Sequence, residues 1–442
     1  LDYQSYQPVH EFINGNYIGV LNMREPNNKH FVYANYGWDD DEIDQWEMSP
    51  DSGYVQKCGT SDAYFELVDI LSPNAANAQT YEEICRVLDI DEFINYMAAQ
   101  LYLGGTDYPQ NNVKSFRHRD GGRFRFVIFD LDFAFNTSNQ FSVFFDKETY
   151  DFNDLYPKEL GHIRAQIRLV TLFKNMLQNQ DFRRRFIDTY CLMGGSVFEA
   201  SRCDEIIDEL LNRVEPAMNL KGESSRSVAN ELKTNFQNRL SSAISTLKNY
   251  KTFNLSSSTA RQISLSSNID GAKLYINNIE VPTGKFNGKL FNPATLKAVA
   301  PAGYKFKRWE RDNGQSYSTN AEISMPSSDI TLVATFTALT QRELTSQGIT
   351  PVRINEVSGS NDSYIDEYGK KGDWVELYNT TDKEIDVEGM YLTDNLSKPT
   401  KYQITKGETG ANTIIPAHGY LIIWCDKRET SDNGLHASFK ID

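Results

Sequence analysis

Two short motifs place oxygen-bearing side chains close together in the first third of this 442-residue chain. Asp107 is followed five positions later by Asn112, and Asp130 and Asp132 flank a single leucine further on. Alternate side chains of a strand point to the same face, so a strand that ends here would present both later aspartates together. Carboxylate and amide oxygens are the ligands that Mg²⁺ and Mn²⁺ prefer in proteins. The two motifs therefore predict a divalent-cation site.

The order of these residues also matches what phosphoryl transfer requires of a kinase-like site. An aspartate accepts the proton of the attacking hydroxyl, an asparagine five residues later binds metal, and a hairpin delivers a second metal-binding aspartate. We assign the first role to Asp107 and the second to Asn112, which would also contact the cofactor. Asp130 or Asp132 takes the third role. The spacing D-x-x-x-x-N is common by chance, and Asp and Asn also stabilise turns, so the alternative is a purely structural role.

A helix and a hairpin are expected to position these residues. The helix is predicted because apolar side chains recur at helical spacing, at Phe93, Ile94, Met97 and Leu101. Gly104-Gly105 then ends it, since glycine is favoured where a chain leaves a helix. Residues 113–118 and 123–129 are predicted to pair as a hairpin around Asp120-Gly121-Gly122. The cation site would lie between the loop after the helix and the end of the hairpin.

Composition limits the classes of protein to which the chain can belong. It is 40% hydrophobic and 24% charged, with a net charge of −15 and a pI near 5.0. An acidic surface repels phosphate backbones, which argues against nucleic acid as a partner. The sequence has no run of about eighteen apolar residues, so no membrane span is predicted. Its five cysteines show no C-x-x-C pair, which disfavours a zinc site or a disulfide framework.

A second hairpin is predicted upstream, where Asn14-Gly15-Asn16 separates two strand-like segments. These segments are His10–Ile13 and Tyr17–Met23. Glu25 follows the hairpin and is a candidate cofactor-binding residue, with a solvated strand end as the alternative. No lysine precedes Lys29. The lysine that pairs with nucleotide phosphates in kinase-like sites is therefore not evident here.

The rest of the chain changes character twice. Residues 151–251 are predicted to be all helical, with helices at Glu159–Gln178, Asp181–Met193, Arg202–Met218 and Ser224–Tyr250. A polar linker at 254–259 leads to the strand-rich segment 262–336. A second linker leads to short alternating strands from residue 352 onward. Length and these changes together predict three domains, at 1–251, 252–338 and 339–442.

Three segments of the first domain carry a family resemblance: INGNYIGVLNMRE (13–25), NYMAAQLYLGGTDYPQNN (95–112) and GGRFRFVIFDLDFAF (121–135). Through them the domain resembles the spore-coat CotH kinase family, whose members are atypical, secretory-pathway kinase-like proteins. The resemblance implies an α+β kinase-like fold with ATP and Mg²⁺ (or Mn²⁺) as cofactors and phosphoryl transfer to protein. The family's upstream strands are not seen before Leu1, so we expect mostly the large lobe and an incomplete small lobe.

A second resemblance lies in the strand-rich segment. Its residues are GYKFKRW (303–309), ISMP (323–326) and DITLVATF (329–336). They resemble the small all-β repeat of bacterial surface proteins known from internalins. Such a module acts as a spacer or an adhesive unit, and nothing in it suggests catalysis.

The last segment resembles the lamin-tail domain family. The matching residues are VRINEVSGSN (352–361), GDWVELYNTTDKEIDVEGMYLTDN (372–395) and IIPAHGYLIIWCDK (414–427). The resemblance implies an immunoglobulin-like β-sandwich, and regular short strands agree with it. The chain stops in a late strand, so the domain is expected to be C-terminally incomplete. A set of polar residues forms either a calcium cluster or the caps of turns: Asn355, Glu356, Asp373, Glu376 and Asn379.

Two functions are consistent with these observations. One is a secreted or cell-surface kinase-like enzyme that uses ATP and Mg²⁺, with Asp107 as its base. The other is a non-catalytic surface adhesin or scaffold with a degenerate kinase-like domain. A carbohydrate-active accessory protein is a weaker third, because strand aromatics usually serve packing. The β-modules favour an extracytoplasmic location in each case, while the phosphoacceptor, oligomeric state and organism stay open.

Overall fold

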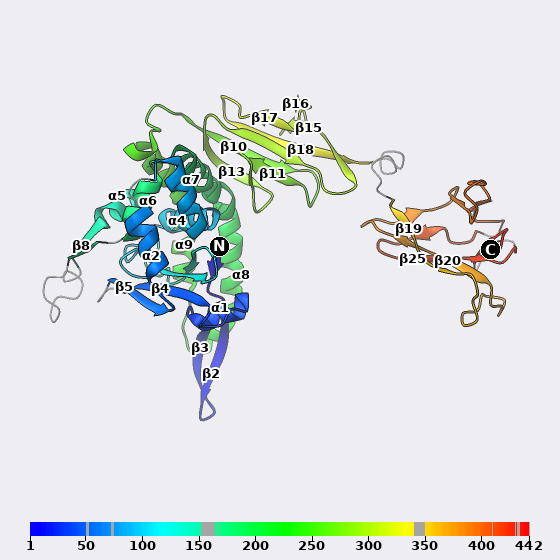
Figure 1. Ribbon diagram of the computed structural model, residues 1–442, viewed down its shortest axis with the longest axis horizontal. Helices are drawn as coiled ribbons and strands as arrows, with labels where there is room; N and C mark the ends of the chain where they lie inside the picture. The colour runs from blue at the N-terminus through cyan, green and yellow to red at the C-terminus, as the bar shows by residue number, and fades with distance from the viewer. Residues whose placement is uncertain are drawn as a thin grey trace. The chain divides into compact units, whose positions relative to one another are not determined.

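The computed structural model describes residues 1–49, 53–71, 75–151, 164–166, 168–339, 350–408, 410–428, 430 and 434–441. They fall into two compact units, which are coloured along the chain in Figure 1. The first unit holds residues 1–300 with 306–336, and the second holds 301–305 with 337 onward. An α+β region is followed by all-β modules, which confirms the predicted fold class.

A mixed five-stranded sheet lies at the centre of the α+β region, in the order β1-β7-β6-β4-β5. Its strands are β1 (Asp2–Tyr3), β4 (Ile43–Ser49), β5 (Gly53–Cys58), β6 (Lys114–His118) and β7 (Arg125–Ile128). Val127 packs in one cluster with Phe31 of helix α1 (Lys29–Tyr36). The preceding residue, Phe126, stacks instead on Tyr96 of another helix, α4. The sheet is therefore covered on both faces, as its alternating side chains require.

Helix α4 (Ile90–Leu103) is the central helix of this region. Of its residues only Asp91 and Asn95 are not buried. The Asp89 side chain caps the first turn by accepting a hydrogen bond from the backbone N–H of Glu92 at 3.2 Å. Gly104 ends the helix in the left-handed conformation, with φ of 67°. The predicted helix and its glycine stop are both confirmed.

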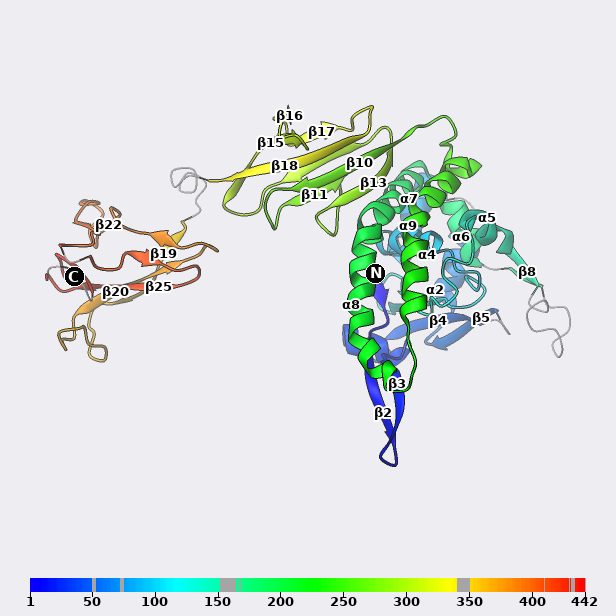
Figure 2. The same cartoon turned by 180° about the vertical axis from the view of Figure 1, so that it is seen from behind.

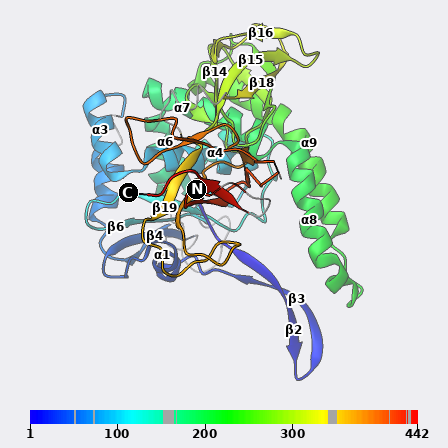
Figure 3. The same ribbon diagram turned by 90° about the vertical axis from the view of Figure 1, so that its right-hand side faces the viewer.

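The N-terminal hairpin is also present, as β2 (Tyr6–Ile13) and β3 (Asn16–Arg24). Asn14 and Gly15 both have positive φ, 51° and 80°, which is the two-residue turn that an Asn-Gly pair favours. Figure 3 shows the two strands projecting away from the five-stranded sheet. The Tyr17 hydroxyl donates to the Ala217 carbonyl at 3.1 Å and so attaches the hairpin to helix α8.

The remaining helices surround α4. They are α2 (Asp62–Phe65) with a π-helical turn (Glu66–Leu71), α3 (Ala78–Val87), α5 (Gln140–Phe145) with a 3₁₀ turn (Asp146–Glu148), α6 (Arg168–Met176), α7 (Gln180–Leu192) with a π-helical turn (Met193–Val197), α8 (Ala200–Asn219) and α9 (Arg226–Asn249) with a 3₁₀ turn (Lys251–Phe253). Figure 2 shows α8 and α9 side by side.

The all-helical prediction for residues 151–251 is wrong at its start. Strand β8 (Thr149–Asp151) pairs with β9 (Arg164–Gln166), and among the described residues of this segment the first helix begins at Arg168. Part of the predicted helix, residues 159–163 and 167, lies outside the described residues. The other predicted helices of this segment are present, and Pro216 lies inside α8, as the predicted helix Arg202–Met218 required.

A β-module follows within the first unit. It has two sheets, ordered β13-β10-β18-β15-β16 and β12-β11-β14-β17. The strands are β10 (Ala260–Ser267), β11 (Lys273–Ile276), β12 (Ile279–Glu280), β13 (Phe286–Phe291), β14 (Thr295–Val299), β15 (Tyr304–Arg311), β16 (Ser316–Ser318), β17 (Glu322–Ser324) and β18 (Ile330–Ala338). The module packs on α7, where Asn277 donates to the Asp188 carboxylate at 2.8 Å. A Cβ on Gly195 would lie 2.9 Å from the Gly288 Cα, so these glycines permit close packing.

The second unit is the all-β tail. Its main sheet has the order β19-β20-β25-β26, with the pairs β21-β24 and β22-β23 beside it. The strands are β19 (Val352–Ser358), β20 (Asp373–Asn379), β21 (Ile385–Asp386), β22 (Tyr391–Leu392), β23 (Tyr402–Gln403), β24 (Ile414–Ile415), β25 (Tyr420–Cys425) and β26 (Leu435–Ala437). Alternating residues of β20 and β25, among them Val375, Leu377 and Ile423, form its core.

Candidate active site

Asn112 joins the two motifs singled out in the sequence. Its amide nitrogen donates to the Asp107 carboxylate and lies 3.5 Å from the Asp130 carbonyl. No donor among the described residues reaches the amide oxygen, which therefore could accept a further ligand. Asn112 and Asp130 both have left-handed backbone, with φ of 57° and 52°. Such non-glycine residues cost roughly 1–3 kcal/mol each and concentrate at functional sites.

The surroundings of Asp107 raise the pKa of its carboxyl. Burial raises the pKa of its carboxyl above the ordinary 3.8, and the negative charges of Asp132 and Asp130 raise it further. The residue's own backbone N–H and Lys147 oppose this rise in the pKa. A base works best when its pKa approaches the pH at which it operates.

Asp130 and Asp132 lie past the end of their strand. β6 and β7 form the predicted hairpin, with Lys114 opposite Val127, but β7 stops at Ile128. Strand alternation therefore does not set the directions of the two carboxylates, contrary to the expectation from the sequence. Both residues are exposed.

A cleft adjoins these two aspartates. Its volume is about 660 Å³, within the range of small-molecule sites. One wall is apolar and comes from α8 and α9, with Leu210, Val214, Val228 and Leu232 among its residues. Asp130 and Asp132 line the cleft, while Asp107 and Asn112 are not among its lining residues. We call Asp130 and Asp132, which line the cleft, the outer pair of the predicted site. Asp107 and Asn112, which do not line it, are the inner pair.

The three carboxylates do not form a closed cage. Among the described residues, Asp107, Asp130 and Asp132 do not bring one oxygen each within 4.8 Å of one another. Mg²⁺ keeps several waters and binds through one or two carboxylates plus phosphate oxygens. The donor set of Asn112 with one or two aspartates fits such an ion, and water and phosphate would complete its shell.

Lys147 holds the loop that carries Asp107, and sequence reasoning missed it. Its ammonium donates to the carbonyls of Thr106 and Tyr108, the latter at 2.9 Å, and to the Gln110 side chain at 2.7 Å. Burial lowers the pKa of this lysine to about 8, although Asp107 opposes the shift. A lysine in a polar turn is ordinarily a surface residue, so no local signal marks it.

Comparison with family models assigns the region that holds this site. Residues 1–256, more than half of the chain, match the model of the CotH kinase protein family. The chain belongs to that family. Residues 291–340 match the Divergent InlB B-repeat domain, and residues 345–442 match the Lamin Tail Domain, which is immunoglobulin-like. All three resemblances predicted from the sequence are thereby confirmed. A search of curated proteins finds no match.

Membership of the CotH kinase family implies the use of ATP. The described part of the chain contains no helix that is both long and apolar enough to cross a bilayer.

Glu25 of the CotH region makes hydrogen bonds away from the cluster. Its carboxylate accepts from the Asn35 amide at 2.7 Å and from the Ser5 backbone N–H at 3.4 Å. These contacts connect the hairpin to α1. The neighbouring residue, Arg24, lines the cleft with the two aspartates and makes no ion pair with any described residue.

Arg239 of the CotH region secures the segment after Asp132. It is buried and donates to the carbonyls of Thr137, at 2.9 Å, and Leu103, at 3.2 Å. Its guanidinium also lies 4.8 Å from the centre of the Phe135 ring. This arginine of α9 thus connects the end of α4 with the segment that follows the metal-ligand candidates.

Proposed function

We propose that the CotH region transfers the terminal phosphoryl group of ATP to a hydroxyl of a protein substrate, with Mg²⁺ or Mn²⁺ as cofactor. The observation that carries this proposal is the position of Asn112 between Asp107 and Asp130, with its amide oxygen unused. That geometry orients the base and leaves a metal ligand available. Phosphoryl transfer depends mainly on positioning and charge stabilisation, which such a cluster supplies.

Each part of the site has a separate task. Asp107 accepts the proton of the attacking hydroxyl, and Asn112 with Asp130 or Asp132 holds the divalent ion. When bound, the ion neutralises charge on the phosphate oxygens. Arg24 is the cation of the cleft that is placed to pair with phosphate, in the absence of a lysine before Lys29. The apolar wall of α8 and α9 offers a surface for the base of the nucleotide.

A phosphate-transfer assay on the full chain tests the proposal, with radiolabelled ATP, Mg²⁺ or Mn²⁺, and a protein acceptor or the chain itself. Asp107→Asn keeps the shape and the Asn112 contact but removes the base. We expect transfer to fall by about 10²–10⁴-fold. Asp120→Asn is the matched control, because Asp120 is an exposed aspartate in the turn between β6 and β7. Equal transfer by wild type and Asp107→Asn would contradict the assignment.

A non-catalytic surface scaffold is the second candidate. It is favoured by the hydrogen bond that already satisfies Asp107 without a cation. Thermal unfolding separates the two functions, because a ligand that binds only the folded form raises the melting temperature. A rise with MgATP that persists in Asp107→Asn supports the enzyme, and no rise in either protein supports the scaffold. The repeat and tail modules agree with display outside the cytoplasm under both proposals.

A further inference from the structure

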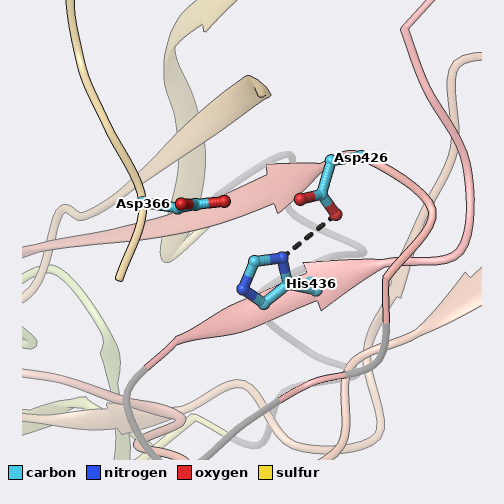
Figure 4. Close-up of side chains that lie close together, drawn as sticks. All are labelled: Asp366, Asp426 and His436. Atoms are coloured by element: carbon cyan, nitrogen blue, oxygen red, sulfur yellow. Dashed lines mark hydrogen bonds and ion pairs between the residues drawn. The ribbon is translucent and has the colours of Figure 1, made fainter. Parts of the chain in front are cut away.

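The lamin-tail domain contains a second cluster of possible ligands, shown in Figure 4. Asp366 lies in the loop before β20, Asp426 directly follows β25, and His436 is in β26. One ligand atom from each lies within 4.8 Å of the others. We propose that these three residues bind a divalent transition-metal ion such as Zn²⁺ or Mn²⁺. The site is separate from the CotH cluster and does not depend on the function proposed for it.

The three ligand side chains are largely buried, and one of their oxygens accepts no hydrogen bond from the described residues. The side chains of Asp366 and His436 are 0% exposed, and that of Asp426 is 7% exposed. Oδ2 of Asp426 is buried and accepts no hydrogen bond from the described residues. Nε of Arg428 lies 3.5 Å from this oxygen, at the limit of a hydrogen bond, so a cation bound directly to the oxygen would compensate its burial more fully. This oxygen is the observation that points to a ligand.

The surroundings of His436 point to a cation at the same place. Its Nε2 lies 3.0 Å from Oε1 of Glu367, and its Nδ1 lies 3.0 Å from Oδ1 of Asp426. A neutral imidazole has a single N–H. If Nε2 of a neutral imidazole donates to Glu367, Nδ1 faces the Asp426 oxygen without a hydrogen, and either a bound cation or a second ring proton would complete the contact. A metal-bound histidine typically donates its other N–H to a carboxylate in this way.

Arg428 now supplies positive charge to the cluster. Its Nη1 lies 2.8 Å from Oδ2 of Asp366, and its Nε lies 3.5 Å from Oδ2 of Asp426. The arginine side chain is 36% exposed and its guanidinium lies over the Tyr368 ring at 5.2 Å. It can therefore leave towards solvent when a metal ion enters. Arginine and metal would compete for the same two carboxylates.

The donor set selects the class of ion. One imidazole nitrogen with two carboxylate oxygens suits Zn²⁺ or Mn²⁺, because Ca²⁺ and Mg²⁺ prefer shells made only of oxygen. Ligand atoms around a tetrahedral ion with bonds near 2.1 Å are about 3.4 Å apart. Small side-chain rotations would bring these atoms to that separation. The three residues supply three protein ligands, so the fourth position of a tetrahedral ion would be taken by water.

Three of the five polar residues first considered for calcium in this domain, Asn355, Glu376 and Asn379, make hydrogen bonds within the fold. Asn379 is buried and donates to the carbonyls of Ile415, at 3.1 Å, and Pro416, at 3.0 Å. Asn355 donates to the Glu376 carboxylate at 2.7 Å. These contacts are the turn and strand interactions that formed the alternative to a calcium cluster.

Metal binding to the full chain tests the proposal, by calorimetric titration with Zn²⁺ and Mn²⁺ and by metal analysis after dialysis. Asp130 and Asp132 are both changed to Asn in the parent protein, so that the CotH cluster does not contribute. We expect one equivalent of metal per chain, lost in His436→Gln. His418→Gln is the matched control, because His418 pairs with Asp382 at 2.7 Å on the surface of the same domain. Retention of metal by His436→Gln, or no metal in the parent, would overturn the proposal.

A second variant keeps the test decisive if His436→Gln fails to fold. Arg428→Gln removes the competing cation while leaving all three ligands in place. We expect its metal affinity to rise by about tenfold, and its melting temperature to increase when metal is added. An unchanged or weaker affinity in Arg428→Gln would contradict the competition that the geometry implies.

Discussion

The CotH region and the lamin-tail domain each gather carboxylates, yet in opposite ways. The CotH cluster comes from two nearby stretches of chain, and Asp130 and Asp132 are exposed at a cleft. The tail cluster comes from the loop before β20 and from the segments around β25 and β26, and it is largely buried. Catalytic metal sites keep an open position for substrate, whereas structural sites are closed. Under the two proposals, the first cluster is open to substrate and the second is largely buried from it.

The positively charged residue beside each cluster also differs, both in its burial and in the groups that it binds. Lys147 is buried and binds neutral acceptors of the loop around Asp107, so it positions the site without occupying it. Arg428 is partly exposed and binds two carboxylates directly. Lys147 therefore orders a loop, whereas Arg428 neutralises the carboxylates that the proposed metal ion would bind. Four experiments test this contrast.

The largest effect is expected from the outer pair of the CotH cluster. Asp130→Asn with Asp132→Asn removes the charges that hold the divalent ion, so phosphate transfer should fall by at least about 100-fold. Raising the Mg²⁺ concentration should recover part of it, which a transfer assay across a metal titration would show. The unfolding of the tail domain should be unchanged. A double variant with full activity would remove both residues from the site.

The two organising cations form a matched pair for the second experiment. Lys147→Met leaves buried acceptors of the loop without their donor, which should lower the free energy of unfolding by about 2–4 kcal/mol. Misplacing Asp107 should reduce transfer by roughly 10–100-fold. Arg428→Met should leave transfer unchanged. Urea unfolding measures the stability of each variant, and the transfer assay measures its activity. An equal loss of transfer in the two variants would contradict the different roles given to Lys147 and Arg428.

Glu92 of α4 is a buried carboxyl, as Asp366 is in the tail. Asp366 is paired with Arg428, whereas no ion pair of Glu92 is found among the described residues. Burial raises its pKa to about 8, although Arg125 opposes the shift. The ordinary value is 4.5, so between pH 4.5 and 8 the folded state holds a proton that the unfolded state has released. The free energy of unfolding therefore falls as pH rises through this window.

Glu92→Gln should abolish that dependence, because a neutral amide oxygen can still accept from the Phe126 N–H, which now donates to Glu92 at 3.1 Å. The difference between wild type and variant should change by on the order of 3 kcal/mol between pH 5 and pH 8. Urea unfolding at the two pH values measures it. If the free energy of unfolding of both proteins changed equally with pH, the raised pKa of the Glu92 carboxyl would be contradicted.

The smallest effect is expected at Glu25. Glu25→Gln should change transfer by less than about threefold, because the carboxylate contacts Asn35 and Ser5 and the neighbouring Arg24 faces the cleft. Arg24→Gln is the partner variant, and it should raise the KM for ATP by about tenfold through loss of a phosphate contact. A stronger effect at Glu25 than at Arg24 would restore Glu25 as the cofactor-binding residue.

Some features of the site were predictable because they depend on neighbours in sequence. The apolar period that ends at Gly104 predicted α4, and Asn14-Gly15 predicted the first hairpin. The Asp107 to Asn112 spacing predicted a contact that is present. By contrast, the strand β9 within a predicted helix shows that pairing with a distant segment can outweigh local periodicity. Similarly, β7 ended before Asp130, so strand alternation did not apply there.

The sequence by itself determined the elements and the family of this protein, because helical period, turn conformation and motif spacing act over a few residues. Only the tertiary structure decided which polar groups are buried together. Lys147 reaches the Asp107 loop, and Asp366 meets His436, through folding of chain segments far apart in sequence. Burial makes such contacts strong, since a polar group removed from water must find a partner wherever the fold provides one.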